Sequence, residues 1–520
     1  MRRLSLGLLL FVALSATTVA RAQVQQAGQM APTPAQWAEI RATAAQFVDR
    51  ESPPGILPFR MSSPAVLASA PHTTFAHYFP PYPLALSDVP TTNDAYNRVL
   101  LNPDGGHGQF VRIGGYLRDR PLPVGPWPSR YWRQIDYAIE IMRAERIGLD
   151  GFECDLLRAP PSPQFSDSDA VHLLMQTADA VAPEFRIVVE PDGAALRHVP
   201  AANVAAAVAS LARYPSAYRL SDGRLLITPF APDIEGPQYW QAGLADLQSR
   251  GIRTAFIPVL LNWRRAASQF ASLSYAMSAW GERDVDGTEN GFRGFDTAMT
   301  PDTSLVMMPV GPQDVRPKVQ RFWESRNTDA YRMLWARAIA QGVRFVQIVT
   351  WNDYSETTGI SPSAGTQFLF YDLTAYFNDW YKTGTPPPIV HDAIYYSERT
   401  EIIPPETGSL ADATMRPMGR TPVSNRIQML AFLIAPATIK IALNGRTWHQ
   451  NEPAGLAVFS IPAEPGRPVF SVVRSGTVVA QVRSAWDIHR SFTVENPAYF
   501  GGSSNRPFIP VPPWVGDPNG

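Results

Sequence analysis

Short apolar runs alternate with longer segments through most of the chain. Each run is rich in β-branched or aromatic residues, which are typical of strands. Several runs are almost continuously apolar, as expected of strands that are covered on both faces. The runs are Thr74–Phe79, Gly151–Leu157, Arg186–Glu190, Arg224–Pro229, Thr254–Leu261, Ser274–Trp280, Leu305–Val310 and Phe345–Trp351.

Several segments between these runs have the pattern of helices. They are Tyr131–Arg146, Val204–Arg213, Tyr239–Ser249 and Ala330–Gln341. Strands that alternate with helices over about 300 residues predict an α/β fold, a (β/α)8 TIM barrel. A doubly wound sheet is the main alternative, but no glycine-rich fingerprint follows any early strand.

The pattern changes after Tyr381. Thr385 to Pro388 is rich in proline, and short strand-like runs follow, separated by Gly and Pro. They predict a smaller C-terminal β-sandwich-like domain. These runs are Gln428–Ile434, Ile439–Leu443, Leu456–Ile461, Val469–Val473 and Val478–Val482.

These changes divide the chain into five segments. We expect a signal peptide (1–22), a lead-in segment (23–70) with a short polar helix, the catalytic barrel (71–384), the accessory sandwich-like domain (385–495), and an extended or disordered tail (496–520).

Composition narrows the function classes. The chain has 520 residues, 45% of them hydrophobic, and a formal net charge of −1, so no general attraction to nucleic acid or anionic lipid is expected. Its 50 prolines are scattered among apolar segments, which excludes wholesale disorder. Lysines occur at positions 318, 382 and 440 alone, which leaves few places for Schiff-base or phosphate-loop chemistry.

The N-terminus has the features of an export signal. Arg2 and Arg3 precede an apolar core, Leu4 to Leu14, and Ala20-Arg21-Ala22 resembles a cleavage site. The core is too short to span a bilayer; a retained N-terminal anchor is the alternative. We therefore expect a secreted or periplasmic protein without membrane contact after cleavage, and a monomer. Cys154 is the single cysteine, lies in an apolar run and is expected to be a buried thiol.

Acids, aromatics, His and Asn follow the predicted strands at the end where a barrel places its reactive groups. Aromatic faces stack on sugar rings, and Asp, Asn and His bond to their hydroxyls. We therefore expect a sugar-binding site. The expected substrate-binding residues are His77, Tyr78, Asp155, Asp192, Trp280, Glu282, Trp351, Asn352 and Tyr354.

Asp353 and Glu356 are the candidate catalytic pair, because cleavage of a glycosidic bond needs two carboxyl groups in different protonation states. Taken singly, each feature has a simpler interpretation: solvated loop acids, a structural His77, or rim packing by Trp280. Their joint placement at strand ends favours a site. No Gly-x-Ser-x-Gly occurs and no histidines have metal-ligand spacing, so neither metal nor cofactor is expected.

Three motifs carry a family resemblance. They are Phe75-Ala76-His77-Tyr78-Phe79, Gly148-Leu149-Asp150-Gly151-Phe152 and Thr350-Trp351-Asn352-Asp353-Tyr354-Ser355-Glu356. In this order they resemble glycoside hydrolase family 71, the endo-acting α-1,3-glucanases (mutanases), over about residues 70–385. The acid-x-x-acid arrangement is also similar to that of the endo-α-mannosidase family 99.

The resemblance implies a (β/α)8 barrel with a β-sandwich, a polysaccharide substrate and an inverting endo-hydrolysis of α-1,3-glucan. It implies that Asp353 and Glu356 match the catalytic acids; we assign Glu356 as general acid and Asp353 as the group that positions water. Another α-linked polymer, such as a mannan or an exopolysaccharide, is an alternative substrate. A non-catalytic glycan-binding protein is the alternative from a different class.

Overall fold

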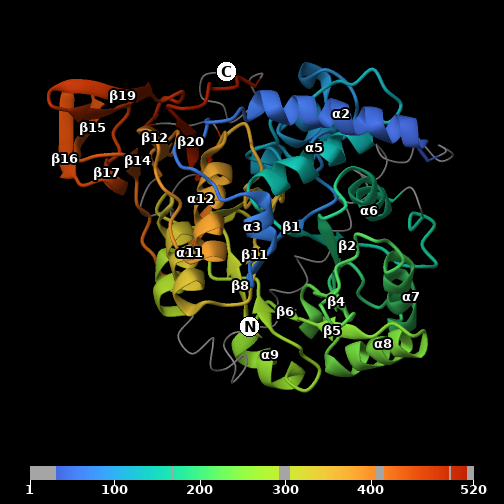
Figure 1. The fold of residues 1–520 in the computed structure, drawn as a ribbon. Helices are drawn as coiled ribbons and strands as arrows, with labels where there is room; N and C mark the ends of the chain where they lie inside the picture. The colour runs from blue at the N-terminus through green and yellow to red at the C-terminus, as the bar shows by residue number, and fades with distance from the viewer. Residues whose placement is uncertain (1–30, 167–168, 292–304, 404–414, 491–493, 512–520) are drawn as a thin grey trace.

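A ring of parallel strands forms the centre of the protein (Figure 1). The structure is a computed structural model that describes residues 31–166, 169–291, 305–403, 415–490 and 494–511. The predicted signal peptide and the last residues of the predicted tail lie outside these ranges. One sheet has the order β5-β4-β3-β2-β1-β11-β8. Its strands are β1 (Thr73–Tyr78), β2 (Gly151–Leu156), β3 (Arg186–Pro191), β4 (Leu225–Ile227), β5 (Thr254–Phe256), β8 (Met307–Val310) and β11 (Phe345–Ile348).

Two short strands close the ring. β6 (Val259–Leu260) follows β5 and pairs in parallel with β7 (Ser278–Ala279). Parallel bridges join Phe230 to Val259 and Met277 to Val306, so β7 is linked to the segment that leads into β8. The predicted (β/α)8 barrel is confirmed, and every one of the predicted apolar runs contains a strand.

Helices surround the strands in Figure 1. They are α5 (Trp132–Arg146), α6 (Ala170–Val181), α7 (Ala201–Leu211), α8 (Pro237–Ser249), α9 (Trp263–Phe270), α11 (Asp329–Gln341) and α12 (Leu369–Thr383). The predicted helices correspond to α5, α7, α8 and α11 and are confirmed. α12 was not predicted from the sequence, and nearly all of its residues are buried.

The barrel interior changes character along the strands. Phe75, Val188 and Phe345 belong to an apolar cluster inside the ring. Two residues further along β1 and β3 come His77 and Glu190, which share the inward direction because strand side chains alternate between faces. The apolar layer therefore supports a polar layer at the carboxyl ends of the strands.

The lead-in segment forms α2 (Pro34–Glu51) and α3 (Pro64–Ala68). Thr33 starts α2 with a capping box, in which its hydroxyl accepts from the Gln36 N–H and the Gln36 side chain accepts from the Thr33 N–H. The Arg143 guanidinium of α5 binds the Glu51 carboxylate at 2.6 and 2.8 Å. This segment therefore packs against the barrel helices.

After the barrel come two four-stranded antiparallel sheets, β17-β14-β12-β20 and β16-β15-β18-β19. Tyr396 and Phe470, from different sheets, stack at 5.0 Å between ring centroids. The predicted β-sandwich-like architecture is confirmed, and β20 lies where an extended or disordered tail was expected. The strands are β12 (Ala393–Glu398), β14 (Arg426–Leu433), β15 (Ala437–Leu443), β16 (Arg446–Glu452), β17 (Gly455–Pro462), β18 (Val469–Arg474), β19 (Thr477–Arg483) and β20 (Phe500–Ser503).

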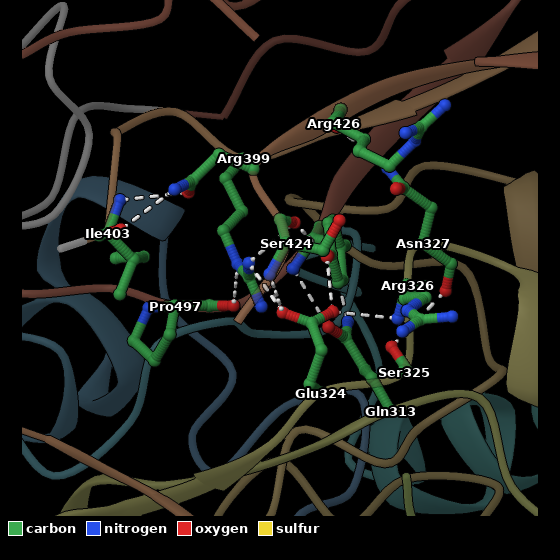
Figure 2. A network of polar contacts seen from close by, with 12 residues as sticks. Gln313, Glu324, Ser325, Arg326, Asn327, Arg399, Ile403, Ser424, Arg426 and Pro497 are labelled. Carbon is green, nitrogen blue, oxygen red and sulfur yellow. Dashed lines mark hydrogen bonds and ion pairs between the residues drawn. The ribbon is translucent and has the colours of Figure 1, made fainter. Parts of the chain in front are cut away.

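A small sheet and a buried ion pair join the barrel to the sandwich. The sheet has the order β13-β10-β9, with bounds β9 (Asp314–Arg316), β10 (Arg321–Trp323) and β13 (Arg416–Met418). Figure 2 shows Glu324, just after β10, at the centre of a polar network. Its carboxylate binds Arg399 at 3.0 Å and accepts from the Ser424 N–H at 2.9 Å.

Within the described residues, no helix is long and apolar enough to cross a membrane.

Candidate active site

The loop after β11 holds both predicted catalytic acids in one tight turn. The Asp353 N–H donates to the Thr350 hydroxyl at 2.8 Å. Oδ1 of Asp353 accepts from the N–H and hydroxyl of Ser355, at 2.9 and 2.7 Å, and from the Glu356 N–H at 3.2 Å. Such side-chain-to-backbone bonds stabilise a turn. They bring the two acids close together at the carboxyl end of the barrel.

Three cations surround this pair. Arg316 Nη2 lies 2.6 Å from Oε2 of Glu356, and the same guanidinium binds both oxygens of Asp314 at 2.6 and 2.7 Å. Arg283 also pairs with Asp314. Lys318 Nζ donates at 3.0 Å to the hydroxyl of Ser355.

The surroundings of the two acids move their pKa values in opposite directions. Arg316, Lys318 and Arg283 hold the pKa of Glu356 below its usual range, with help from a hydrogen bond from Trp280, although burial opposes this. Burial, together with the negative charge of Glu356, raises the pKa of Asp353. A pair whose environments move its pKa values apart is suited to acid and base roles.

His77, Asp155, Asp192 and Trp280 lie on the inward side of the strands beside this pair. Edge-to-face contact places the His77 ring 4.8 Å from that of Trp280, and His77 Nδ1 lies 2.5 Å from Oε2 of Glu190. Burial lowers the pKa of His77 to about 4, against the opposing effect of Asp353 and Asp192.

The two inward aspartates differ in their contacts. Oδ1 of Asp192 accepts from the N–H groups of Ala194 and Ala195 at 2.6 and 2.9 Å. Oδ1 of Asp155 is buried and has no hydrogen-bond partner among the described residues. Burial, with Asp192 and Glu190 nearby, raises the pKa of Asp155 well above its usual value. Asp155 therefore has an oxygen available for a ligand.

Tyr78 and Trp351 point away from the barrel axis. The Tyr78 hydroxyl donates to Glu140 of α5 at 2.7 Å, and the Trp351 indole N–H donates to the same carboxylate at 3.3 Å. Both rings pack against Phe152 in the layer between strands and helices. The structure therefore places these predicted substrate contacts in the wall of the barrel, where they support the site from behind.

The remaining predicted residues are also separated from the inward group. Asn352 ties two loops together: its side chain bonds the backbone of Phe79 and of Tyr82. Tyr354 is buried in an apolar cluster against Tyr96. Glu282 pairs with Arg264 at 3.6 Å and borders a neighbouring hollow of about 480 Å³.

The predicted site residues did not include Arg283, Arg316 and Lys318, and Glu190 was recognised at the end of a predicted strand without being assigned to the site. The three cations stand in polar segments without periodic pattern, and the rarity of lysine was the single signal that could have drawn attention to Lys318. Among the described residues, no group of three or more His, Cys, Asp and Glu side chains is arranged to hold a metal ion.

Residues 128–505 match the model of glycosyl hydrolase family 71. The chain belongs to this family. The predicted family is therefore confirmed, and the match extends beyond the barrel through the sandwich. As a family 71 member, the protein is a glycoside hydrolase, as the sequence predicted.

Two curated relatives and one solved structure are similar to this family 71 chain. A glucan endo-1,3-alpha-glucosidase of Schizosaccharomyces pombe is 22% identical over 382 residues, which cover 68% of this chain and 86% of the yeast protein. An ascus wall endo-1,3-alpha-glucanase of the same yeast is 22% identical over 405 residues, which cover 67% of this chain and 88% of that protein. The family 99 endo-alpha-mannosidase of Bacteroides thetaiotaomicron has a TM-score of 0.43 at 13% identity, covering 59% of this chain and 97% of the mannosidase chain.

Proposed function

We propose that this family 71 protein is an endo-acting, inverting hydrolase of α-1,3-glucan, with Asp353 and Glu356 as its catalytic acids. Support for the substrate comes from the two yeast relatives, which are named as endo-1,3-alpha-glucan hydrolases. The observation that carries the catalytic assignment is the single turn that holds both acids, with pKa values displaced in opposite directions.

We further propose that Asp353 gives its proton to the leaving oxygen and that Glu356 accepts a proton from the attacking water. An acid must be protonated before the reaction, and burial favours that form of Asp353. A base must be charged, and Arg316 favours that form of Glu356. This is the reverse of the assignment made from the resemblance alone.

His77, Asp155, Asp192 and Trp280 are the proposed contacts of the sugar at the cleavage point. Trp280 offers an aromatic face and the aspartates offer acceptors for sugar hydroxyls. Glu282 borders the neighbouring hollow and would reach a sugar unit further along the chain. Tyr78, Trp351, Asn352 and Tyr354 are proposed to hold these groups in place from the surrounding layers.

The proposed division of the chain is that of the sequence: a signal peptide (1–22) directs export, a lead-in (23–70) precedes the catalytic barrel (71–384), and an accessory domain (385–495) follows before the tail (496–520). The protein would act as a secreted or periplasmic monomer. The packing of α2 against α5 is consistent with a lead-in that stabilises the barrel.

The proposal is tested by release of reducing sugar from linear α-1,3-glucan, with mannan and α-1,4-glucan as comparison substrates. We expect turnover of α-1,3-glucan by the native protein and a loss of at least about a hundredfold in Asp353→Asn and in Glu356→Gln. Asp487→Asn, in a half-exposed ion pair of the sandwich, is the matched control and should keep native activity. Turnover of mannan instead would replace the substrate, and binding without turnover would favour a glycan-binding protein.

The general acid and the general base are distinguished by assaying the Asp353 and Glu356 variants on an α-1,3-linked oligosaccharide that carries an aryl leaving group of low pKa. Such a leaving group needs no proton, so Asp353→Asn should recover most of its activity on it, whereas Glu356→Gln should not. Recovery in Glu356→Gln alone would restore the opposite assignment. A β-anomer as the first product, observed by NMR, would support inversion; an α-anomer would contradict it.

A further inference from the structure

His77 and Glu190 meet inside the barrel although β2 lies between their strands. Alternate strands of a (β/α)8 barrel contribute side chains to the same interior layer. β1 and β3 are alternate strands, and His77 Nδ1 lies 2.5 Å from Oε2 of Glu190. Their exposed fractions are 3% and 0%. The contact is therefore part of the barrel's interior layer.

Three aromatic rings pack around the imidazole. Trp280 meets it edge to face at 4.8 Å, Phe79 stacks at 6.2 Å and Phe230 lies at 6.4 Å. Among the described residues, Glu190 is the side chain that hydrogen-bonds the ring. The orientation of the ring and the identity of its protonated nitrogen thus depend on Glu190.

The surroundings of this pair are strongly acidic. A net negative charge on the pair is unfavourable there, because the site is buried and like charges repel. Burial raises the pKa of Glu190 well above its usual value and lowers that of His77 to about 4. The acids that act on the pair are Glu153 and Asp155 on β2, Asp192 after β3, and Asp353 and Glu356 after β11. Lys318, after β9, acts on Asp192, Asp353 and Glu356 rather than on the pair itself.

The favoured state of the pair is therefore neutral and holds two hydrogens. One lies in the bridge between the Glu190 carboxyl and Nδ1, and the other is on Nε2 of His77. A sugar hydroxyl beside Glu356 can donate to that carboxylate, but it also needs a donor for its own oxygen. An Nε2–H group on His77 supplies such a donor.

We propose that Glu190 is a positioning residue that fixes the His77 ring and keeps Nε2–H as a hydrogen-bond donor to the sugar at the catalytic acids. This inference rests on the proposed function, because it assigns a role within that site. Glu190 itself makes no contact with substrate in this arrangement.

The state of the ring is tested without substrate by ¹⁵N NMR of histidine-labelled full-length protein, with His77→Gln to assign the signals. We expect Nε2 of His77 to carry hydrogen from pH 5 to 8 and Nδ1 to accept the bridging hydrogen. The expected pattern persists in Glu190→Gln, whose carboxamide N–H can donate to Nδ1. In Glu190→Met the Nδ1 signal should shift, because its partner is lost. An unprotonated Nε2 in the native protein, or an unchanged Nδ1 signal in Glu190→Met, would overturn the proposal.

Kinetics on α-1,3-glucan provide the second readout. We expect kcat/KM to fall by about tenfold or more in Glu190→Met and to be largely restored in Glu190→Gln. If the role of Glu190 were purely structural, both variants would lose stability and activity together and the NMR pattern of His77 would be unaltered. That result would contradict the assignment. If the native protein does not cleave α-1,3-glucan, the proposed function fails, while the NMR result still decides the state of the ring.

His172 offers a matched control. It is also buried, and its Nδ1 lies 3.0 Å from the hydroxyl of Tyr214, on the outer helix layer of the barrel. Tyr214→Phe removes that hydrogen-bond partner from a buried histidine outside the site. We expect it to change the signals of His172, leave those of His77 unaltered and keep kcat/KM within about twofold of native.

Discussion

Arg316 binds Glu356 and Asp314 at the same time: its Nη2 lies 2.6 Å from Oε2 of Glu356, and two further contacts of 2.6 and 2.7 Å reach Asp314. A guanidinium held by two carboxylates has little freedom to leave either one. The catalytic base proposed here is therefore paired with a cation that is itself anchored.

Removal of the Arg316 charge should shift the acidic limb of the profile of kcat/KM against pH. Glu356 must be charged to act as a base, so activity falls as pH drops through its pKa. Arg316 holds that pKa below the usual range. In Arg316→Met the pKa should rise, and the acid limb of kcat/KM should move upward by about 1–3 pH units. Arg467→Met breaks an ion pair of similar geometry with Asp487 in the sandwich and should leave the limb in place.

Asn352 should contribute to stability through the loop that it ties down. Its side chain makes three hydrogen bonds to the backbone of Phe79 and Tyr82, at 2.7, 3.2 and 2.8 Å. Asn352→Ala would leave these buried groups unpaired, and we expect the free energy of unfolding to fall by about 2–4 kcal/mol. Asn203→Ala removes a single bond, to the Pro160 carbonyl, and should cost about 1 kcal/mol. Equal losses in chemical denaturation would contradict this account.

The ion pair in Figure 2 should be sensitive to removal of one partner. Glu324 is 0% exposed and Arg399 is 3% exposed. Arg399→Met leaves a buried uncompensated carboxylate and should lower the free energy of unfolding by about 3–5 kcal/mol. Combining it with Glu324→Gln should recover part of the loss.

The exposed pair between Arg446 and Glu464 is the control for this experiment. Arg446→Met should change the free energy of unfolding by less than about 1 kcal/mol, because solvent screens exposed charges. The measurement is a chemical denaturation curve for each variant. If the barrel and the sandwich unfold in two transitions, each transition is fitted on its own. A loss in Arg399→Met no larger than that in Arg446→Met would refute the role of the buried pair.

Glu140 should make stability depend on pH. Burial raises its pKa to about 7, against the opposing hydrogen bonds from Tyr78 and Trp351. Between about 4.5 and 7 the unfolded chain loses the proton and the folded protein keeps it, so the free energy of unfolding falls as pH rises. We expect the native protein to lose stability relative to Glu140→Gln across this window, measured by denaturation at each pH. A constant difference would show that Glu140 ionises normally in the folded state.

Much of the fold could be predicted from local pattern. The strands of the barrel are covered on both faces, so each appears in the sequence as a short apolar run. The helices α5, α7, α8 and α11 were likewise marked by their patterns. β16 and β20 were missed because β16 is mostly polar and exposed, and β20 is a short glycine-containing segment. Their strand state depends on partners supplied by β15 and β12.

The site could be predicted in part. Asp353 and Glu356 follow the last strand of the barrel, and position after a strand is a property of the sequence. The direction in which a side chain points cannot be inferred from the sequence when both faces of its strand are buried. His77 and Tyr78 are neighbours on β1, yet His77 faces the acids and Tyr78 faces α5.

The sequence by itself predicted the barrel strands, four of its helices, the family and a candidate pair of acids, because these follow from apolar periodicity and short motifs. Only the tertiary structure decided which charged groups surround those acids and in which direction each pKa moves. Arg283, Arg316 and Lys318 come from segments outside the loop of the pair, and Glu190 reaches His77 across β2. The electric field on a carboxyl group depends on distances in space, and the closure of the barrel sets those distances.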